Sequence, residues 1–356
     1  MRKIRVITGL DIGSSKTSAV AAGVDASGDL VVLTHASGPS NGISRGAIVN
    51  INEAVNSASA VLNKLRDKVP AGLGDIYVNI NDETVKGSSS KGMIALSLRG
   101  REVTKLDMEK CVDVAGTIHL PMEREIIHRI VHKFSVDDQP SIKNPLGLYA
   151  SRLSCEVYVV TADANHIQNI FKCVNNSGYS VKDIIFTGVA EGQCLLDKDE
   201  KEDGVALVDI GDSLTDIWIF FEGSMRRFDI IPLGARDFKG DFKENSKFVE
   251  MKSRLNTSIK DFVNSGGKVS SVVLTGGMSF TENLAESLEE VLSLSVKMGV
   301  AKGIRGDITS AESVRLSGAI GLVKCGLERY AGKAFASKRF VRNLSERVVD
   351  IFNNYF

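Results

Sequence analysis

Asp11 stands near the end of an apolar run, two residues before a glycine, in an arrangement suited to phosphate chemistry. The surrounding sequence, Val-Ile-Thr-Gly-Leu-Asp-Ile-Gly-Ser-Ser-Lys-Thr, predicts a buried strand that enters a tight turn. Gly13 lets the backbone approach a bound group, so that the amides and side chains of Ser14, Ser15 and Lys16 can wrap a phosphate. The Asp11 carboxylate suits a hydrated Mg²⁺ on that phosphate. Taken alone, a plain β-hairpin ending in Gly-Ser-Ser remains the alternative.

The same design recurs about 200 residues later. The stretch Gly-Val-Ala-Leu-Val-Asp-Ile-Gly-Asp-Ser-Leu-Thr-Asp begins at Gly204 and places Asp209 and Gly211 as in the first turn. It adds hydroxyl groups at Ser213 and Thr215. Two Asp-Ile-Gly turns so far apart predict two similar halves that close on one nucleotide.

A third glycine turn follows the apolar run Ser-Val-Val-Leu-Thr, at Gly276 and Gly277. Together the three turns resemble those of the actin, sugar-kinase and heat-shock-chaperone ATPase fold. This resemblance implies an α/β, ribonuclease-H-like fold of two domains with ATP and Mg²⁺ bound between them. It places Gly276 and Gly277 in a loop against the adenosine.

Length and composition limit the fold classes, partners and locations that the sequence allows. A chain of 356 residues suits two domains rather than one core. Its 44 basic and 44 acidic residues cancel, which predicts no nucleic-acid partner. The five cysteines form no Cys-x-x-Cys pair, which favours reduced thiols in a cytoplasmic protein over a zinc site. We expect no signal peptide, because Met1-Arg2-Lys3 leads directly into the first strand, and no apolar run reaches the length of a membrane span.

The elements that position the first turn alternate between strand and helix. A hairpin is expected at 17–23 and 30–36, a helix at 51–65 and a strand at 76–80. Residues 1–84 and 161–200 would form the two parts of the first actin-like half, and residues 201–330 would form the second half.

Residues 85–160 interrupt this pattern and predict a small inserted α+β subdomain. It would contain a helix at 105–118, a strand at 125–134 and a Pro- and Gly-rich loop at 135–152. His128 and His132 lie in the strand. No cysteine or carboxylate pair nearby completes a ligand set, so we interpret them as surface or hydrogen-bonded histidines rather than metal ligands.

Three stretches carry a closer resemblance, to the FtsA family of actin-like bacterial division proteins. They are the inserted segment with its Ile-Lys-Asn-Pro-Leu-Gly loop at 142–147, the stretch Gly-Ile-Ser-Arg-Gly-Ala-Ile-Val-Asn-Ile at 42–51, and residues 169–181. The resemblance implies a scaffold that polymerises at the inner face of the cytoplasmic membrane at the division site and anchors the FtsZ ring. The inserted subdomain would contact neighbouring subunits. The resemblance maps the phosphate loops onto Asp11, Gly13, Ser14, Ser15, Lys16, Asp209, Gly211 and Thr215.

The second half departs from that family in two places. Asp212 and Ser213 stand where the family has glycines, and their side chains would crowd the phosphates. Only about 40 residues separate Pro232 from Val272, where the family holds a further subdomain that walls the adenine pocket and receives the FtsZ tail. What remains predicts one amphipathic helix with Phe248, Met251, Leu255, Ile259 and Phe262 on its apolar face.

The end of the chain predicts a membrane anchor. A final helix at 311–330 and a linker at 331–337 precede residues 338–356, which have the pattern of an amphipathic helix with basic residues on its polar face. Docking of this helix on the protein's own body is the alternative. The apolar face consists of Phe340, Val341, Leu344, Val348, Ile351, Phe352 and Tyr355.

Catalysis is at most a slow ATP hydrolysis. Glu191, in the turn Val-Ala-Glu-Gly, is a candidate for orienting the attacking water, and equally a residue that starts a helix. Two other functions stay open: a pilus-assembly scaffold of the PilM type, and a small-molecule kinase of the same superfamily.

Overall fold

The computed structural model describes residues 6–24, 30–239 and 242–336. The chain divides into two compact units. Of the described residues, those within 6–84 and 165–326 form the larger unit, and those within 85–164 and 327–336 form the smaller unit. The predicted anchor, including Phe340, Val341, Leu344, Val348, Ile351, Phe352 and Tyr355, lies outside the described residues.

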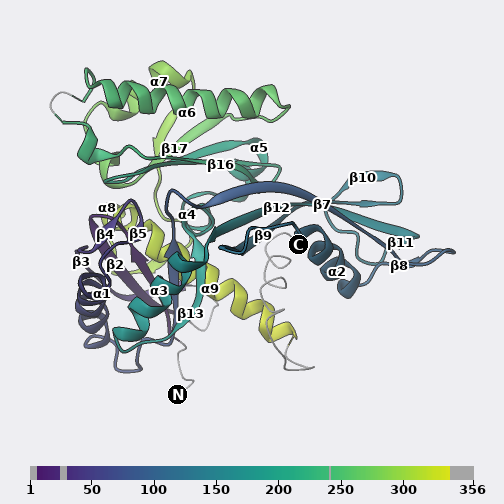
Figure 1. The fold of residues 1–356 in the computed structure, drawn as a ribbon, viewed down its shortest axis with the longest axis horizontal. Coiled ribbons are helices and arrows are strands. Elements are labelled where there is room, and N and C mark those ends of the chain that lie inside the picture. Colours follow the sequence, from purple (N-terminus) through teal and green to yellow (C-terminus); the bar gives the residue numbers. More distant parts are fainter. Residues whose placement is uncertain (1–5, 25–29, 240–241, 337–356) are drawn as a thin grey trace. The chain divides into compact units, whose positions relative to one another are not determined.

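A six-stranded sheet forms the first half of the larger unit (Figure 1). In spatial order its strands are β13 (Val181–Phe186), β6 (Asp75–Ile80), β1 (Val6–Ile12), β2 (Lys16–Val24), β3 (Leu30–Pro39) and β19 (Arg305–Gly306). The central strand β1 is antiparallel to β2 and parallel to β6. A central strand covered on both faces needs apolar side chains on both, which explains its nearly continuous apolar sequence.

Short elements flank this sheet. They are the two-stranded pair β4 (Ile43–Ser44) and β5 (Ala47–Ile48), and the helices α1 (Ile51–Arg66), α3 (Ala164–Asn176) and α4 (Thr187–Leu195). The side chain of Asn50 caps α1 by accepting hydrogen bonds from the amides of Asn52 and Glu53. Ala58 and Leu62 are buried on the inner face of α1. The predicted helix at 51–65 is confirmed.

A five-stranded sheet forms the second half of the larger unit. In spatial order its strands are β16 (Ser224–Ile231), β15 (Thr215–Phe221), β14 (Val205–Ile210), β17 (Ser271–Thr275) and β18 (Val296–Met298). Like β1, the central strand β14 has an antiparallel partner that follows it in sequence and a parallel partner on its other side. The two halves therefore place their Asp-Ile-Gly turns in the same way.

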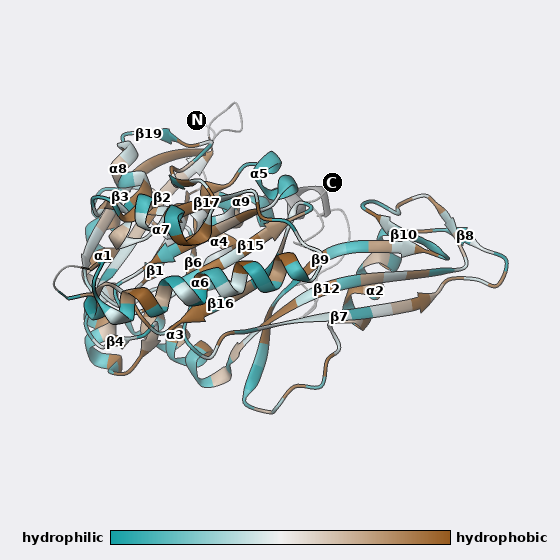
Figure 2. Cartoon of the chain, turned by 90° about the horizontal axis from the view of Figure 1, so that it is seen from above, coloured by the Kyte–Doolittle hydropathy of each residue, from teal (hydrophilic) through white to brown (hydrophobic). Residues whose placement is uncertain are grey.

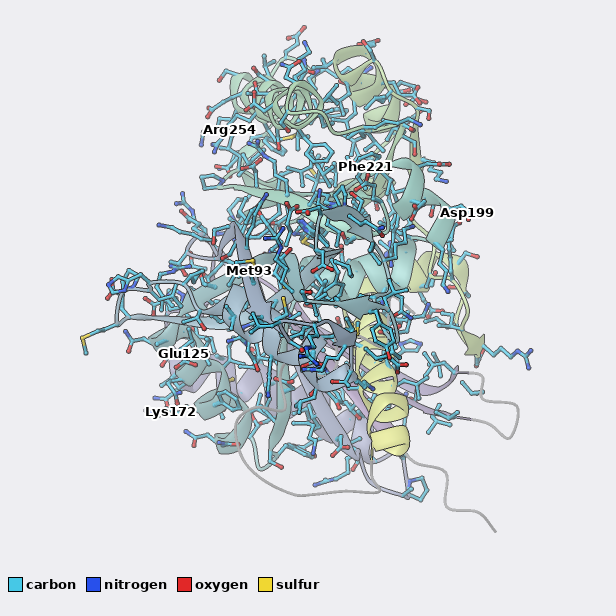
Figure 3. The ribbon with its side chains drawn as sticks, turned by 90° about the vertical axis from the view of Figure 1, so that its right-hand side faces the viewer. Met93, Glu125, Lys172, Asp199, Phe221 and Arg254 are labelled. Carbon is cyan, nitrogen blue, oxygen red and sulfur yellow. The ribbon has the colours of Figure 1, made fainter. Side chains whose placement is uncertain are left out.

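Helices α6 (Ser246–Asn264) and α7 (Leu284–Leu292) lie side by side on one face of this sheet (Figure 1). The hydropathy of α6 changes between its faces (Figure 2). Phe221 of β15, labelled in Figure 3, packs edge-on against Phe262 of α6 with 6.2 Å between ring centroids, whereas Arg254 on the same helix is exposed. The predicted apolar face is confirmed, because Phe248, Met251, Leu255, Ile259 and Phe262 are all buried in this core.

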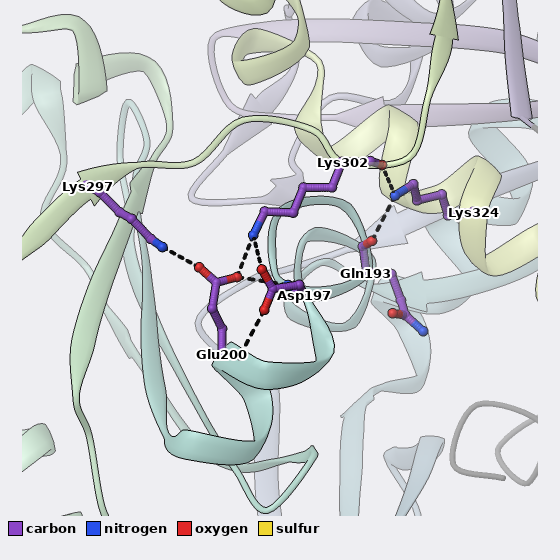
Figure 4. A network of polar contacts seen from close by, with 6 residues as sticks. All are labelled: Gln193, Asp197, Glu200, Lys297, Lys302 and Lys324. Atoms are coloured by element: carbon purple, nitrogen blue, oxygen red, sulfur yellow. Dashed lines mark hydrogen bonds and ion pairs between the residues drawn. The ribbon is translucent and has the colours of Figure 1, made fainter.

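An ion-pair network joins the short helix α5 (Lys198–Asp203) and its N-cap Asp197 to β18 and the segment that follows it (Figure 4). Lys302 Nζ lies 2.8 Å from Asp197 Oδ2 and 2.6 Å from Glu200 Oε2, and Lys297 Nζ lies 2.5 Å from Glu200 Oε1. The Asp197 and Glu200 side chains also cap α5 reciprocally. Partly exposed ion pairs add little stability each, so the network serves mainly to fix where the chain returns to the sheet.

The smaller unit is a four-stranded antiparallel sheet with one helix. Its strands in spatial order are β10 (Gln139–Ile142), β9 (Arg124–Val136), β12 (Arg152–Asp163) and β7 (Lys86–Ala95); α2 (Lys105–Gly116) and the pair β8 (Arg101–Glu102) and β11 (Tyr149–Ala150) complete it. The loop predicted at 135–152 was wrong in part, because β10 and β11 lie within it. Asp137 turns the chain with a left-handed φ of 49°, which lets β10 fold back on β9.

His128 is buried in β9, and the His132 ring stacks on Tyr158 with 5.9 Å between centroids. Within the described residues, no cluster of three or more His, Cys, Asp or Glu is arranged to hold a metal ion.

The end of the described chain differs from the prediction of one helix at 311–330. A break at Leu316 separates α8 (Ser310–Arg315) from α9 (Ser317–Ala336). Helix α9 also continues through most of the predicted linker. Helical periodicity continues across Leu316 in the sequence, so local pattern alone does not reveal the break.

Helix α9 fits very closely against the first half. A Cβ atom added at Gly318 would lie 2.7 Å from Asp11 Oδ2, and one at Gly321 would lie 2.0 Å from the Ala190 carbonyl oxygen. From the other side, a Cβ at Gly9 of β1 would lie 2.1 Å from the Ala319 carbonyl oxygen. These small residues let the helix backbone approach β1 and α4.

All five cysteines lie in the described part, where they are buried and form no disulfide. No helix among the described residues combines the length and the apolar character needed to cross a membrane.

We predict that Asp107→Asn destabilises the smaller unit by about 1–2 kcal/mol at pH 7. Asp107 accepts two hydrogen bonds of 2.7 Å from the Arg101 guanidinium and closes the capping box of α2 with Thr104. The Arg101 guanidinium holds the pKa of Asp107 well below its usual range. This contribution is complete above the unfolded pKa of about 4 and is lost as the pH falls below it.

Urea unfolding of the wild type and the variant, from pH 7 down to pH 3.5, measures this effect. The exposed Asp113 on the same helix provides the control variant Asp113→Asn, which should change stability by less than about 0.5 kcal/mol. A loss for Asp107→Asn that stays the same over the whole pH range would contradict the assignment.

Candidate functional site: two facing glycine turns

The two predicted phosphate turns share one backbone geometry. In the first, the Gly13 amide donates to the Lys16 carbonyl over 3.0 Å, and in the second the Gly211 amide donates to the Leu214 carbonyl over 2.9 Å. Each turn links two antiparallel strands, with Asp11 opposite Ser18 and Asp209 opposite Asp216. The repeat seen in the sequence is thus a repeat of structure.

The turns meet directly. Ser213 Oγ donates a hydrogen bond of 2.8 Å to Ser14 Oγ. The Gly46 amide donates a second one, of 3.0 Å, to the same Ser14 oxygen. Residues 199 positions apart are therefore in contact at one site within the larger unit.

Burial raises the pKa of both aspartates that precede the turns. Loss of solvent raises the pKa of Asp11 above its ordinary value, and the nearby Lys16 partly offsets this. Burial, together with the charge of Asp11, raises the pKa of Asp209 to about 7. The Lys16 ammonium donates to the Arg315 carbonyl over 2.5 Å, which holds it beside both carboxylates.

Glu191 lies inside helix α4, so its placement in a turn was wrong. It is 4% exposed, and Ser317 Oγ donates to its Oε1 over 2.9 Å. Burial, followed by the charge of Asp209, raises the pKa of Glu191 well above its ordinary value. Its Oε2 has no hydrogen-bond partner among the described residues. This carboxyl group belongs to the same site as Asp11 and Asp209.

Asp216 and Asn81 complete the site, and sequence reasoning missed both. Asp216 is 3% exposed, and its Oδ2 accepts a hydrogen bond of 2.8 Å from Asn81 Nδ2. Burial and the charge of Asp209 raise the pKa of Asp216 well above its ordinary value. A signal was present: in an antiparallel hairpin with this turn, the residue paired with Asp209 must be Asp216. Asn81 follows β6 and gave no such signal.

The third turn reaches the same site. Gly276 has a φ of 90°, and a Cβ atom added there would lie 2.0 Å from Asp209 Oδ1. Gly277 begins a short 3₁₀ turn, and a Cβ atom there would meet nothing within 4 Å. Of the two predicted adenosine-loop glycines, Gly276 is thus required by packing, while Gly277 faces open space.

Other candidate residues have structural partners. The Thr215 hydroxyl is fully buried and donates to the Leu233 carbonyl over 2.9 Å. Ser15 is exposed, with its carbonyl bonded to the Ser40 amide. Asp212 forms an ion pair with Arg236. The binding role assigned to Asp11, Gly13, Ser14, Ser15, Lys16, Asp209, Gly211, Ser213, Thr215, Gly276 and Gly277 stays a prediction.

The arrangement of the carboxyl groups is better suited to binding a cation than to hydrogen bonding among themselves. One oxygen each of Glu191, Asp209 and Asp216 is buried without a partner in the described part of the chain. Such atoms are costly unless a ligand or a bound water satisfies them. In the described ranges, no group of three or more His, Cys, Asp or Glu side chains is arranged to hold a metal ion directly.

Comparison with known proteins relates the chain to FtsA proteins. Residues 83–161 match the SHS2 domain inserted in FTSA. The cell division protein FtsA of Pseudomonas aeruginosa is 29% identical over 377 residues, covering 91% of this chain and 90% of the relative. That of Borreliella burgdorferi is 33% identical over 230 residues, covering 65% and 56%. Together these matches support an FtsA-family protein.

Solved structures confirm the fold of the chain. The PilM–PilN type IV pilus biogenesis complex aligns with a TM-score of 0.68 at 14% identity, covering 90% of this chain and 98% of that one. The ethanolamine utilization protein EutJ of Carboxydothermus hydrogenoformans aligns with a TM-score of 0.50 at 12% identity, covering 89% of each. The predicted two-domain actin-like ATPase fold is confirmed.

We predict that Gly276→Ala lowers the melting temperature clearly, whereas Gly277→Ala leaves it within about 1 °C. The first change forces a side chain into a left-handed backbone and onto Asp209, at a cost of more than about 1 kcal/mol, while the second meets open space.

Thermal unfolding followed by circular dichroism compares the two variants. Equal melting temperatures would show that the third turn does not pack on Asp209 as described.

Proposed function

We propose that this chain is an actin-like cell division scaffold that binds ATP with Mg²⁺ between its two glycine turns. The observation that carries the proposal is the contact between Ser14 and Ser213, which brings two turns of equal geometry to one site. The FtsA relatives, which are named cell division proteins, support the cellular role.

In this proposal the turns hold the phosphates. Amide groups after Gly13 and Gly211, with the Lys16 ammonium, would neutralise and orient phosphate oxygens. Asp11 and Asp209 would hold Mg²⁺ through water, and the cation would offset the charge that the carboxylates and phosphates share. Gly276 and Gly277 would face the adenosine.

Hydrolysis would be slow. Glu191 is held by Ser317 with one carboxylate oxygen left over, so it can accept a hydrogen bond from a water molecule. A single orienting group beside the phosphates would accelerate the reaction modestly. ATP would act as a switch only through a higher affinity for the closed, polymerisation-competent arrangement.

The scaffold role would use surfaces that this family relationship suggests. We propose self-association into filaments, peripheral binding to an anionic membrane at the division site through residues 338–356, and FtsZ as a partner. Helix α6 packs directly on the second sheet in the region where a further subdomain would receive the FtsZ tail, so FtsZ would need another contact surface.

The pilus-assembly alternative has less support. The PilM–PilN complex shares the fold, but its 14% identity is below the 29% and 33% of the division proteins. The kinase alternative would require a sugar-dependent ATPase activity.

We predict that the full-length protein binds a fluorescent ATP analogue in a Mg²⁺-dependent manner and that Asp11→Asn weakens this binding at least roughly tenfold, because a charge-assisted contact to the hydrated cation is lost. Fluorescence titration with and without EDTA measures both effects. The exposed Asp113→Asn serves as the matched control and should bind as the wild type does.

Mg²⁺-dependent binding by Asp11→Asn at wild-type strength would contradict the assigned role of Asp11. Absence of binding by the wild type would overturn the nucleotide proposal itself.

We predict that the full-length protein sediments with anionic liposomes, that removal of residues 340–356 abolishes this, and that Mg-ATP increases it. Apolar burial by one amphipathic helix gives weak binding, which filament formation would strengthen. Co-sedimentation with and without Mg-ATP measures it. Sedimentation of the truncated protein to the same extent would contradict the role of residues 340–356 as an anchor. Sedimentation of the full-length protein that Mg-ATP does not change would show that membrane binding does not depend on the nucleotide site.

A further inference from the structure

Ser14 is placed so that its hydroxyl must act as a donor. A serine hydroxyl has one proton to donate and two lone pairs that accept. Ser14 Oγ accepts from the Gly46 amide at 3.0 Å and from Ser213 Oγ at 2.8 Å, so both lone pairs are occupied. No residue in the described ranges accepts the Ser14 proton, which therefore remains available to a ligand beside the turn.

Ser213 is held firmly enough to impose this orientation. It is 3% exposed, and its turn is closed by the hydrogen bond from Gly211 to Leu214. The following segment braces the turn, since the Ala235 amide donates to the Gly211 carbonyl over 2.9 Å and the Arg236 amide donates to the Asp212 carbonyl over 2.9 Å.

The carboxylate of the neighbouring residue, Asp212, interacts with Arg236. Arg236 Nε donates to Asp212 Oδ2 over 2.8 Å, so the Asp212 carboxylate is engaged and partly neutralised on its own side of the turn. The polar atom that the second turn presents to Ser14 is thus the Ser213 hydroxyl. A hydroxyl that donates into another hydroxyl strengthens the second as a donor, because hydrogen bonds in a chain polarise one another.

We infer that Ser213 is a positioning residue that aims the Ser14 hydroxyl proton at the terminal phosphate of a bound nucleoside triphosphate. The inference rests on the proposed nucleotide site and assigns a role within it. Gly276 of the third turn packs against Asp209, which precedes the second turn, and Ser213 of the second turn contacts Ser14. A nucleotide with its base at the third turn would therefore extend its phosphates along the second turn towards Ser14. The contact would favour ATP over ADP.

The test measures ATP and ADP affinities of the full-length protein in Mg²⁺ by isothermal titration calorimetry. Ser213→Ala should raise the Kd for ATP roughly fivefold to tenfold, the usual size of one net hydrogen bond, and change the Kd for ADP less than about twofold. Ser213→Thr keeps the hydroxyl and should restore the preference for ATP. Ser224→Ala, a buried serine of β16 in the same sheet, is the matched control and should change neither affinity.

A double-mutant cycle separates positioning from a general loss of structure. If Ser213 acts through Ser14, Ser213→Ala should have no further effect on ATP binding in a Ser14→Ala background. Additive losses, or equal losses for ATP and ADP in Ser213→Ala, would overturn the inference. So would tighter ATP binding by Ser213→Ala, which would show that the hydroxyl obstructs the phosphate. Failure of the wild type to bind either nucleotide would overturn the proposed function together with this inference.

Discussion

The constraint on which the site depends is the repulsion among four carboxyl groups that the fold gathers in little water. Burial raises the pKa of Asp11, Glu191, Asp209 and Asp216. The charge of Asp11 adds to the shifts of Asp209 and Glu191, and the charge of Asp209 adds to those of Glu191 and Asp216. Lys16 is the cation that lowers the pKa of Asp11 and Asp209. Such an arrangement lowers stability unless protons or a bound cation compensate, which is typical of a site retained for binding.

The architecture that maintains this arrangement is a duplicated one. In each half a central strand ends at an aspartate, turns at a glycine and returns as an antiparallel partner, while a parallel strand supports its other side. Hydrophobic burial in the cores of the two sheets offsets the unfavourable free energy of placing like charges close together. Helices α6 and α7 contribute to that core in the second half and cover its sheet.

Much of this was predictable from sequence where the signal is local. The two turns, the helix at 51–65 and the apolar face of α6 follow from glycine chemistry and periodicity. Asn81 was missed because its role arises from a contact with Asp216, 135 residues away. The break at Leu316 and the short strands β10 and β11 were missed for a similar reason: strand pairing and close packing decide them, and neither leaves a periodic pattern.

The close fit of α9 limits how the proposed nucleotide site can open. At Gly9, Gly318 and Gly321 even a methyl group would collide with its neighbour, so the helix cannot slide along β1 or α4 by a fraction of a turn without steric overlap. Steric overlap therefore opposes shear between α9 and the first half. An opening that leaves α9 in place would instead be a hinge rotation, absorbed by the backbone dihedral angles of segments outside this packed surface.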